Sequence, residues 1–194
     1  MMGLSKRWII LFVFALTAAA LAAGAGSLSS LRIDKMKLTG LKDPSIVIRK
    51  SARTLEVYDG ERLVQTIPMV LGSSPDLDKE TEGDGRTPEG EFYVFTKNPK
   101  SRFHLSLGIS YPAPEDAERG FAGGMISKEE RELILSAAEH RKMPLQKTRL
   151  GGEIYIHGGG TANDWTDGCI ALENAEMTEL FEAIPVGARV TIVK

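Results

Sequence analysis

Two residues that can carry acyl-transfer chemistry stand twelve positions apart near the C-terminus. His157 closes the apolar run Ile154-Tyr155-Ile156 and opens a glycine-rich stretch, and Cys169, the single cysteine of the chain, follows Gly168. A thiolate is the nucleophile of cysteine enzymes, and a neighbouring imidazole lowers the thiol pKa and takes its proton. The pattern predicts that Cys169 is a nucleophile with His157 as its base, and that the thiol ionises below its ordinary value of about 8.5.

Other interpretations of these residues are weaker. A lone cysteine is often a buried, inert side chain, and a histidine at a strand end can be purely structural. The run Gly158-Gly159-Gly160 lacks the Gly-Lys-Ser/Thr of a phosphate-binding loop, and the three histidines are not at metal-motif spacing. The glycine-flanked pair therefore favours catalysis without a metal or another cofactor.

The bulk composition narrows the class of protein. The chain has 194 residues, with 42% hydrophobic and 26% charged residues, which fits one globular domain and a short appendage. A net charge of -2 gives no basic face for nucleic acid. One cysteine also rules out an intramolecular disulfide.

The N-terminus predicts export. Lys6 and Arg7 precede an uncharged apolar run, residues 8–25, that ends in Ala23-Gly24-Ala25. This is the pattern of a secretory signal, and the run is also long enough to remain as a membrane anchor. We therefore expect residues 1–26 to be a signal peptide or anchor, 27–43 a linker and 44–194 the catalytic domain. The domain would lie in the periplasm or cell envelope, released or anchored to the inner membrane.

The elements that must position the pair are mainly strands. Alternating or apolar segments predict strands at 46–48, 55–58, 63–71, 91–96, 153–157 and 188–193. Asp59-Gly60 is typical of a hairpin turn, and Pro68 indicates a sheet edge or a bulge. Residues 98–126, with three prolines, are expected to be irregular.

Two helices complete the expected fold. Ser127 and Glu130 form a capping box that opens a helix to about Arg141, with Leu133, Ile134, Ala137 and Ala138 on its inner face. Asn174 is a good N-cap for a second helix, in which Met177, Leu180, Phe181 and Ile184 recur at helical spacing. The fold class expected is mostly β, a sandwich or barrel with two attached helices.

Over roughly residues 44–193 the sequence resembles the L,D-transpeptidase, or YkuD-domain, family. The resemblance rests on His157-Gly158 and on Thr166-Asp167-Gly168-Cys169-Ile170. It also rests on the loop Gly83-Asp84-Gly85-Arg86-Thr87-Pro88-Glu89-Gly90, and on Ser101-Arg102-Phe103-His104 leading to Ser110-Tyr111-Pro112.

The resemblance implies an L,D-transpeptidase-like β-sandwich and a reaction. The cysteine would attack the carbonyl of the third stem residue, diaminopimelate, of a peptidoglycan tetrapeptide; D-Ala would leave and an amine would resolve the thioester. Cys169 would be the nucleophile and His157 the base, oriented by the Gly158 carbonyl, with backbone N–H groups of Gly168 and Cys169 as the oxyanion site. Expected substrate contacts are Asp84, Arg86, Arg102, His104, Trp165, Thr166 and Asp167.

Two departures leave the acceptor open. Many members carry His where Asp167 stands and Arg where Ala171 stands, so a bound carboxylate would need another cation, Arg86 or Arg102. One hypothesis is a transpeptidase that forms crosslinks or attaches an envelope lipoprotein. The second is a hydrolase, an amidase or carboxypeptidase that cuts such linkages. The third is a non-enzymatic module that binds peptidoglycan stem peptides. An uncleaved N-terminal segment would add the membrane as a partner.

Overall fold

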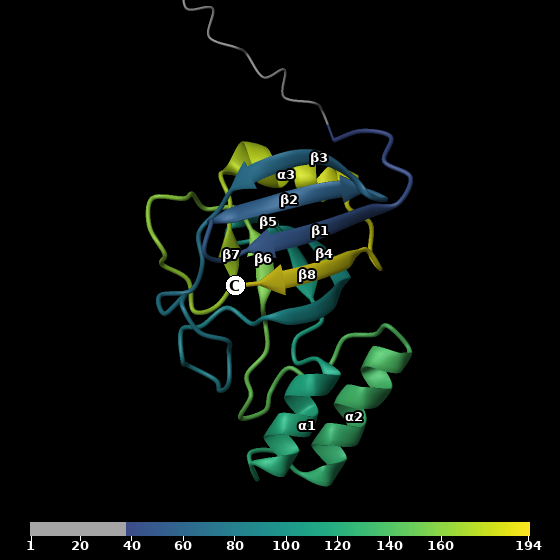
Figure 1. The fold of residues 1–194 in the computed structure, drawn as a ribbon, viewed down its shortest axis with the longest axis vertical. Coiled ribbons are helices and arrows are strands. Elements are labelled where there is room, and N and C mark those ends of the chain that lie inside the picture. The colour runs from purple at the N-terminus through teal and green to yellow at the C-terminus, as the bar shows by residue number, and fades with distance from the viewer. Residues whose placement is uncertain (1–37) are drawn as a thin grey trace, which may run out of the picture. The chain divides into compact units, whose positions relative to one another are not determined.

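The computed structural model describes residues 38–194, so the expected signal segment and most of the linker lie outside the described residues. None of the helices in the described part is long and apolar enough to cross a membrane. The strands of this part form one sheet in the order β3-β2-β1-β8-β4-β5-β6-β7 (Figure 1). Their bounds are β1 (Pro44–Arg49), β2 (Thr54–Asp59), β3 (Arg62–Pro68), β4 (Gly90–Ser101), β5 (His104–Ile109), β6 (Tyr155–His157), β7 (Ile170–Ala171) and β8 (Arg189–Val193). The helices are α1 (Pro114–Ala122), α2 (Lys128–Glu139) and α3 (Asn174–Ala183).

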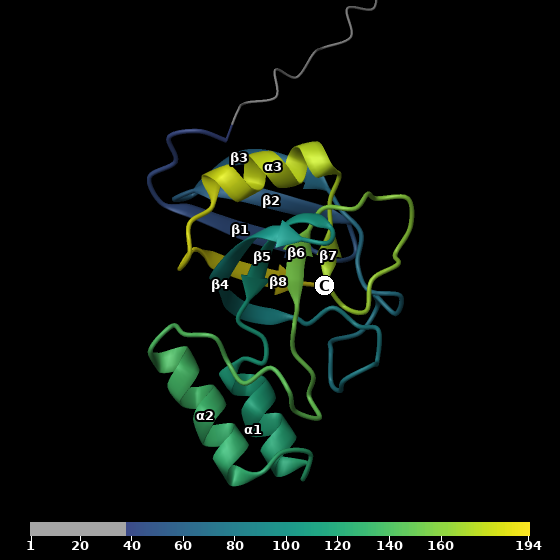
Figure 2. The same cartoon turned by 180° about the vertical axis from the view of Figure 1, so that it is seen from behind.

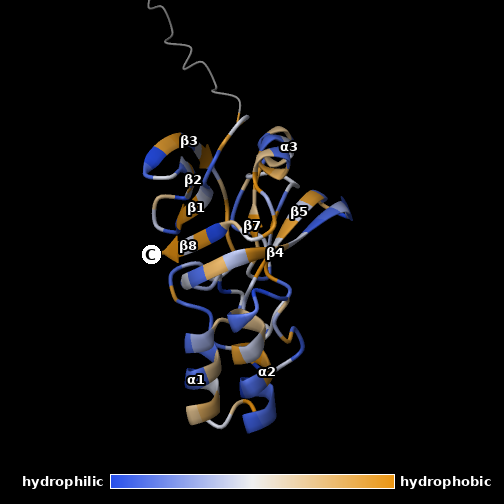
Figure 3. Cartoon of the chain, turned by 90° about the vertical axis from the view of Figure 1, so that its right-hand side faces the viewer, coloured by the Kyte–Doolittle hydropathy of each residue, from blue (hydrophilic) through white to orange (hydrophobic). Residues whose placement is uncertain are grey.

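The long strand β4 turns the sheet into a sandwich. Its first half, Gly90–Tyr93, pairs with β8, and from Val94 onward it pairs with β5 after a register shift. Figure 3 shows β1, β2 and β3 on one side and β5 and β7 on the other, with β4 reaching across. The main core contains side chains from both halves, including Ile46, Ile48, Val94, Ile109 and Ile156. The mostly-β sandwich expected from the sequence is confirmed.

The local signals for the first three strands are also confirmed. Asp59 pairs with Arg62 around a two-residue loop in which Gly60 adopts a φ of 61°, a conformation that favours glycine. Pro68 ends β3, which is the edge strand of the sheet, where a missing N–H costs no ladder hydrogen bond.

Helix α3 runs along the sandwich beside β5 (Figure 2). Met177, Leu180 and Ile184 are fully buried, and Phe181 packs against the core, as the helical spacing predicts. The expected cap is wrong by one residue, because Glu173 is the N-cap and makes no side-chain cap bond. Asn174 instead accepts the Gly159 N–H on its Oδ1 at 2.9 Å, so it ties the helix start to the glycine-rich loop.

The expectation that residues 98–126 are irregular is wrong. β4 continues to Ser101, β5 follows, and Pro114 opens a helix that raises the described helices from two to three. Pro114 is the first helical residue, where its missing N–H is harmless, and Asp116 accepts the Ala113 N–H at 2.9 Å. Pro114, one of the three prolines of this segment, is therefore part of a helix start.

Helices α1 and α2 form an insertion between β5 and β6 with a small core of its own, formed by Ala117, Ile126, Ile134 and Leu150. The capping box of α2 is confirmed, with Glu130 N–H donating to Ser127 Oγ at 3.1 Å and Ser127 N–H to Glu130 Oε2 at 2.8 Å. Leu133 is 58% exposed, so its expected inner position is wrong. The reason is that α2 packs on one neighbouring helix, which covers only a narrow stripe.

A buried lysine fastens the loop 72–90 to the end of β1. The Lys50 side chain is almost fully buried, and Nζ donates to Leu77 O at 2.8 Å, Thr87 O at 2.9 Å and Glu89 Oε1 at 2.8 Å. All three ammonium protons therefore have acceptors, which makes burial of the charge tolerable. Lys50 therefore ties the loop that packs against the cysteine turn to the end of β1.

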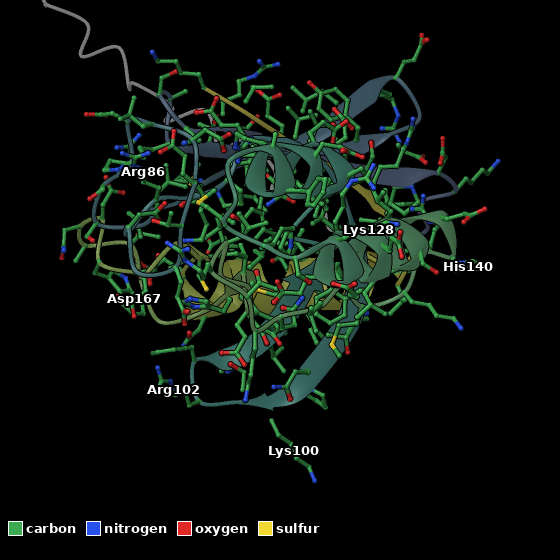
Figure 4. The ribbon with its side chains drawn as sticks, turned by 90° about the horizontal axis from the view of Figure 1, so that it is seen from below. Arg86, Lys100, Arg102, Lys128, His140 and Asp167 are labelled. Atoms are coloured by element: carbon green, nitrogen blue, oxygen red, sulfur yellow. The ribbon has the colours of Figure 1, made fainter. Side chains whose placement is uncertain are left out.

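We expect Lys50→Met to lower the free energy of unfolding by about 2–4 kcal/mol, because it leaves two carbonyls and a carboxylate without their donor. Denaturant unfolding measures the change. Lys100→Met is the matched control, because Lys100 is exposed and extends from the end of β4 (Figure 4); it should change stability by less than about 0.5 kcal/mol. Equal stability of the two variants would contradict this role of Lys50.

Candidate active site

The pairing of β6 with β7 brings His157 and Cys169 to one face of the sheet. These strands are parallel, with Ile156 opposite Ile170 and His157 opposite Ala171. Extending the register by one residue sets Cys169 beside Tyr155, whose N–H donates to Sγ at 3.4 Å. Because alternate residues of a strand share a face, the odd-numbered side chains lie opposite the buried Ile156 and Ile170. The structure thus brings the two expected catalytic residues together.

The surroundings of Cys169 favour the neutral form of its thiol. Sγ donates to Glu153 O at 3.5 Å and accepts the Tyr155 N–H, and no hydrogen bond within residues 38–194 joins it to His157. Burial raises the pKa of the thiol to about 11; the Tyr155 N–H opposes this rise, and the nearby Asp167 carboxylate adds to it. The expectation of a lowered thiol pKa is therefore corrected, because desolvation outweighs every group that would stabilise the thiolate.

His157 is held as the tautomer that a base requires. Its Nδ1 lies 2.5 Å from the carbonyl oxygen of Gly158, which can only accept, so Nδ1 carries the proton and Nε2 is left as an acceptor. The side chain is buried, and this burial lowers its pKa below the ordinary 6.5 although the Gly158 carbonyl favours the charged form. His157 is accordingly neutral at pH 7.

Two aromatic rings fix the plane of the imidazole. Phe103, in the β4–β5 turn, stacks on His157 with ring centroids 4.7 Å apart, and Trp165 meets it edge-on at 5.5 Å. Arg102 lies over the Phe103 ring at 4.6 Å, and its charge further lowers the His157 pKa. Trp165 and Arg102 are thus part of the surroundings of the base, whereas His104 bonds to Thr178 of α3 through Nε2 at 2.8 Å.

Gly168 allows the cysteine turn to approach the loop 83–90. Its φ is 130°, and a Cβ there would lie 2.7 Å from Arg86 O, too close for any side chain. Its N–H donates to Thr166 Oγ1 at 3.2 Å, and the same hydroxyl donates to Cys169 O at 2.7 Å. Of the two expected oxyanion donors, the Cys169 N–H has no acceptor recorded in the described part of the chain, and the Gly168 N–H would have to leave Thr166.

Asp84 and Arg86 organise the loop rather than face open space. The Asp84 carboxylate accepts from Lys79 Nζ at 2.7 Å and from the N–H groups of Glu80, Thr81 and Arg86. Although burial opposes it, these donors lower the Asp84 pKa to about 2. Arg86 donates to Asp78 O at 3.1 Å and lies 3.3 Å from Glu80 Oε2. Asp167 is exposed, and Figure 4 places it on the same side of the molecule as Arg86 and Arg102.

Sequence reasoning missed three residues that shape this site. Asp164 is bound by Arg53 at 2.7 Å and accepts the Leu71 N–H at 2.8 Å, which anchors the loop 158–168 to the residues around β3. Glu153 presents its carbonyl to the thiol from a positive φ of 54°, a conformation rare outside glycine. Glu173 carries a carboxylate beside Thr161. Only Asp164, a carboxylate inside a glycine-rich loop, gave a signal in the sequence.

Most of the chain is similar to known L,D-transpeptidase domains. Residues 43–192 match YkuD, the L,D-transpeptidase catalytic domain. The putative L,D-transpeptidase YqjB of Bacillus subtilis (strain 168) is 26% identical over 155 residues, covering 77% of this chain and 71% of its own.

Two solved structures share the fold. The helical cell shape determining protein Pgp2 from Campylobacter jejuni has a TM-score of 0.55 and 23% identity over 82% of this chain. Bdellovibrio bacteriovorus Bd1075 has a TM-score of 0.50 and 20% identity over 79% of it. The chain spans about half the length of each, 51% and 48% respectively. With the family match extending over most of its length, the chain belongs to the L,D-transpeptidase catalytic-domain family.

Proposed function

We propose that this protein is a peptidoglycan L,D-transpeptidase that works through an acyl-enzyme on Cys169. The observation that carries the proposal is the shared face of β6 and β7, on which the thiol lies near an imidazole locked with Nε2 as acceptor. In the proposed reaction Sγ attacks the carbonyl of the diaminopimelate–D-Ala bond of a tetrapeptide stem. D-Ala leaves, and an amine then releases the acyl group.

The protonation states favour general-base catalysis over a preformed ion pair. Burial keeps the thiol protonated and the imidazole neutral, so neither partner is charged before substrate binds. His157 Nε2 takes the thiol proton as the C–S bond forms, and gives it to the departing D-Ala amine. The Cys169 N–H would stabilise the oxyanion, joined by the Gly168 N–H once it turns from Thr166.

The cation for a substrate carboxylate is proposed to be Arg102. Ala171 is fully buried and carries no charge, and Arg86 is occupied by Asp78 and Glu80. Arg102 is exposed, packs on Phe103 and is close enough to His157 to influence its pKa. It is therefore the better placed of the two arginines considered for this contact.

The place of action is proposed from the N-terminal pattern alone. A basic flank followed by an apolar run indicates export, which would bring the domain to the peptidoglycan and to envelope lipoproteins. A reporter enzyme that is active only outside the cytoplasm, fused after Lys194, tests this; an inactive fusion of an expressed protein would contradict export.

Because both side chains are proposed to be neutral, we expect His157→Ala to affect two reactions of Cys169, acylation and alkylation, to different extents. His157→Ala should slow acylation by a carbapenem by about 100-fold or more, because its strained amide is attacked with general-base help. The rate of alkylation by iodoacetamide follows the thiolate fraction and should be low at pH 7. His157→Ala should change this rate by less than about threefold. Intact-protein mass spectrometry follows both reactions.

His140→Ala is the matched control, because this imidazole is exposed at the end of α2 (Figure 4) and should affect neither reaction. The pH profile adds a second check. Acylation requires neutral His157, whose pKa is lowered, so its rate should fall only below pH 6.5. An alkylation midpoint below pH 8.5 that rises in His157→Ala would instead show a preformed thiolate–imidazolium pair.

The transpeptidase and the hydrolase are separated by one reaction with tetrapeptide muropeptides, with and without an added D-amino acid. We expect exchange of the terminal D-Ala for the added amino acid, analysed by liquid chromatography with mass spectrometry. Tripeptide products that do not respond to the acceptor would decide for the hydrolase. Muropeptide binding without any release of D-Ala would decide for the non-enzymatic module.

A further inference from the structure

An open pocket lies beside Trp165. It has a volume of about 510 Å³ and is lined by Gly159, Gly160, Thr161, Ala162, Trp165 and Glu173. Trp165 contributes to its wall and also meets the His157 ring edge-on at 5.5 Å, so the pocket adjoins the residues that surround His157. Trp165 is one of the substrate contacts expected from the sequence, whereas the other residues that line this pocket have no role in the proposed function.

The pocket carries a negative charge with no cation to balance it. Glu173 Oε1 accepts the Thr161 N–H at 2.9 Å and its hydroxyl at 2.6 Å, which fixes the carboxylate in place. No Lys, Arg or His of the described chain forms an ion pair with Glu173, and no donor is recorded for its Oε2. A Cβ on Gly160 would lie 3.8 Å from Oε1 and 4.0 Å from Oε2, so the bare glycine leaves the space over the carboxylate open.

The backbone holds Glu173 next to the loop that follows His157. Beyond the paired residues His157 and Ala171, the Leu172 N–H donates to His157 O and the Gly160 N–H to Leu172 O. Glu173 is the next residue, and its carboxylate accepts from Thr161 of the same loop. The charge therefore lies just beyond the strand end that carries His157.

We propose that this pocket binds the acceptor of the transpeptidation as a primary ammonium, paired with Glu173 and resting against the Trp165 ring. A carboxylate together with an aromatic face is the combination that attracts an ammonium group. This inference rests on the proposed function, and it identifies the second substrate as an amine-bearing amino acid or stem peptide. Water needs no such pocket.

The chemical step balances with the residues present. The ammonium gives one proton to neutral His157 Nε2, and the amine nitrogen then bonds to the thioester carbonyl carbon. The bond from that carbon to Sγ breaks, and the second amine proton goes to the departing thiolate. The products are an amide and the Cys169 thiol, and His157 returns its proton to solvent.

The direct test measures binding in the absence of turnover. In full-length protein with Trp8→Phe, Trp165 is the one remaining tryptophan. Titration with D-lysine should change its fluorescence, and N-acetylated D-lysine with both amines blocked should not. Glu173→Gln keeps an oxygen that can accept from Thr161 but removes the charge, and should weaken D-lysine binding about fivefold, the scale of an exposed ion pair. Glu182→Gln makes the same charge change at an exposed site on α3 and should have no effect.

Turnover gives an independent test. With tetrapeptide donor and D-methionine acceptor, Glu173→Gln should raise the acceptor KM about fivefold while the first-turnover release of D-Ala stays within about twofold. Thr161→Val loosens the carboxylate without removing its charge and should have the smaller effect. An unchanged acceptor KM together with no ammonium binding would contradict the acceptor role of the pocket, without contradicting the transpeptidase activity. Ammonium binding without release of D-Ala would contradict the transpeptidase activity, while the pocket would still be an ammonium site.

Discussion

The hydrogen-bonded register between β6 and β7 is the constraint on which the rest of the site depends. It sets His157 opposite Ala171 and brings Cys169 beside Tyr155, so a shift by one residue would turn the side chains of His157 and Cys169 into the core. The register tolerates no side chain at Gly168, because Arg86 O lies 2.7 Å from the position that a Cβ would take. The loop 72–90 therefore packs directly against the cysteine turn, and Lys50 holds that loop from β1.

Burial shifts the protonation equilibria of Cys169 and His157. The same desolvation raises the pKa of Cys169 and lowers that of His157, so both groups wait uncharged and the proton moves only when a carbonyl is in reach. A thiol that stays protonated is also a poor target for oxidants, whose attack follows thiolate character. That property suits a lone cysteine in a chain proposed for export to an oxidising compartment.

The sequence was informative where short-range rules apply. Hairpin residues such as Asp59-Gly60, the capping box at Ser127 and the apolar period of α3 predicted elements that the structure contains. The sequence was misleading where one residue type occurs in two structural settings. Pro114 starts a helix instead of breaking one, and Leu133 points to solvent because its helix packs on one neighbour.

The juxtaposition of His157 and Cys169 could be predicted from spacing and glycine flanks, but the electrostatics of the two side chains could not. The sign of the Cys169 pKa shift depends on packing by segments far away in sequence, and so does the burial of His157 under Phe103 and Trp165. Arg86 matched a motif yet bonds within its own loop. Glu173 matched none, because its significance arises only where the strand ends beside the pocket.

The most direct measurement of the central claim is the intact mass of the protein after brief incubation with tetrapeptide muropeptides, followed by mapping of the modified peptide. The account predicts a mass increase equal to the donor minus D-Ala, located on the peptide that contains Cys169 and absent from Cys169→Ala. Release of D-Ala without any covalent adduct, or an adduct that persists in Cys169→Ala, would contradict it.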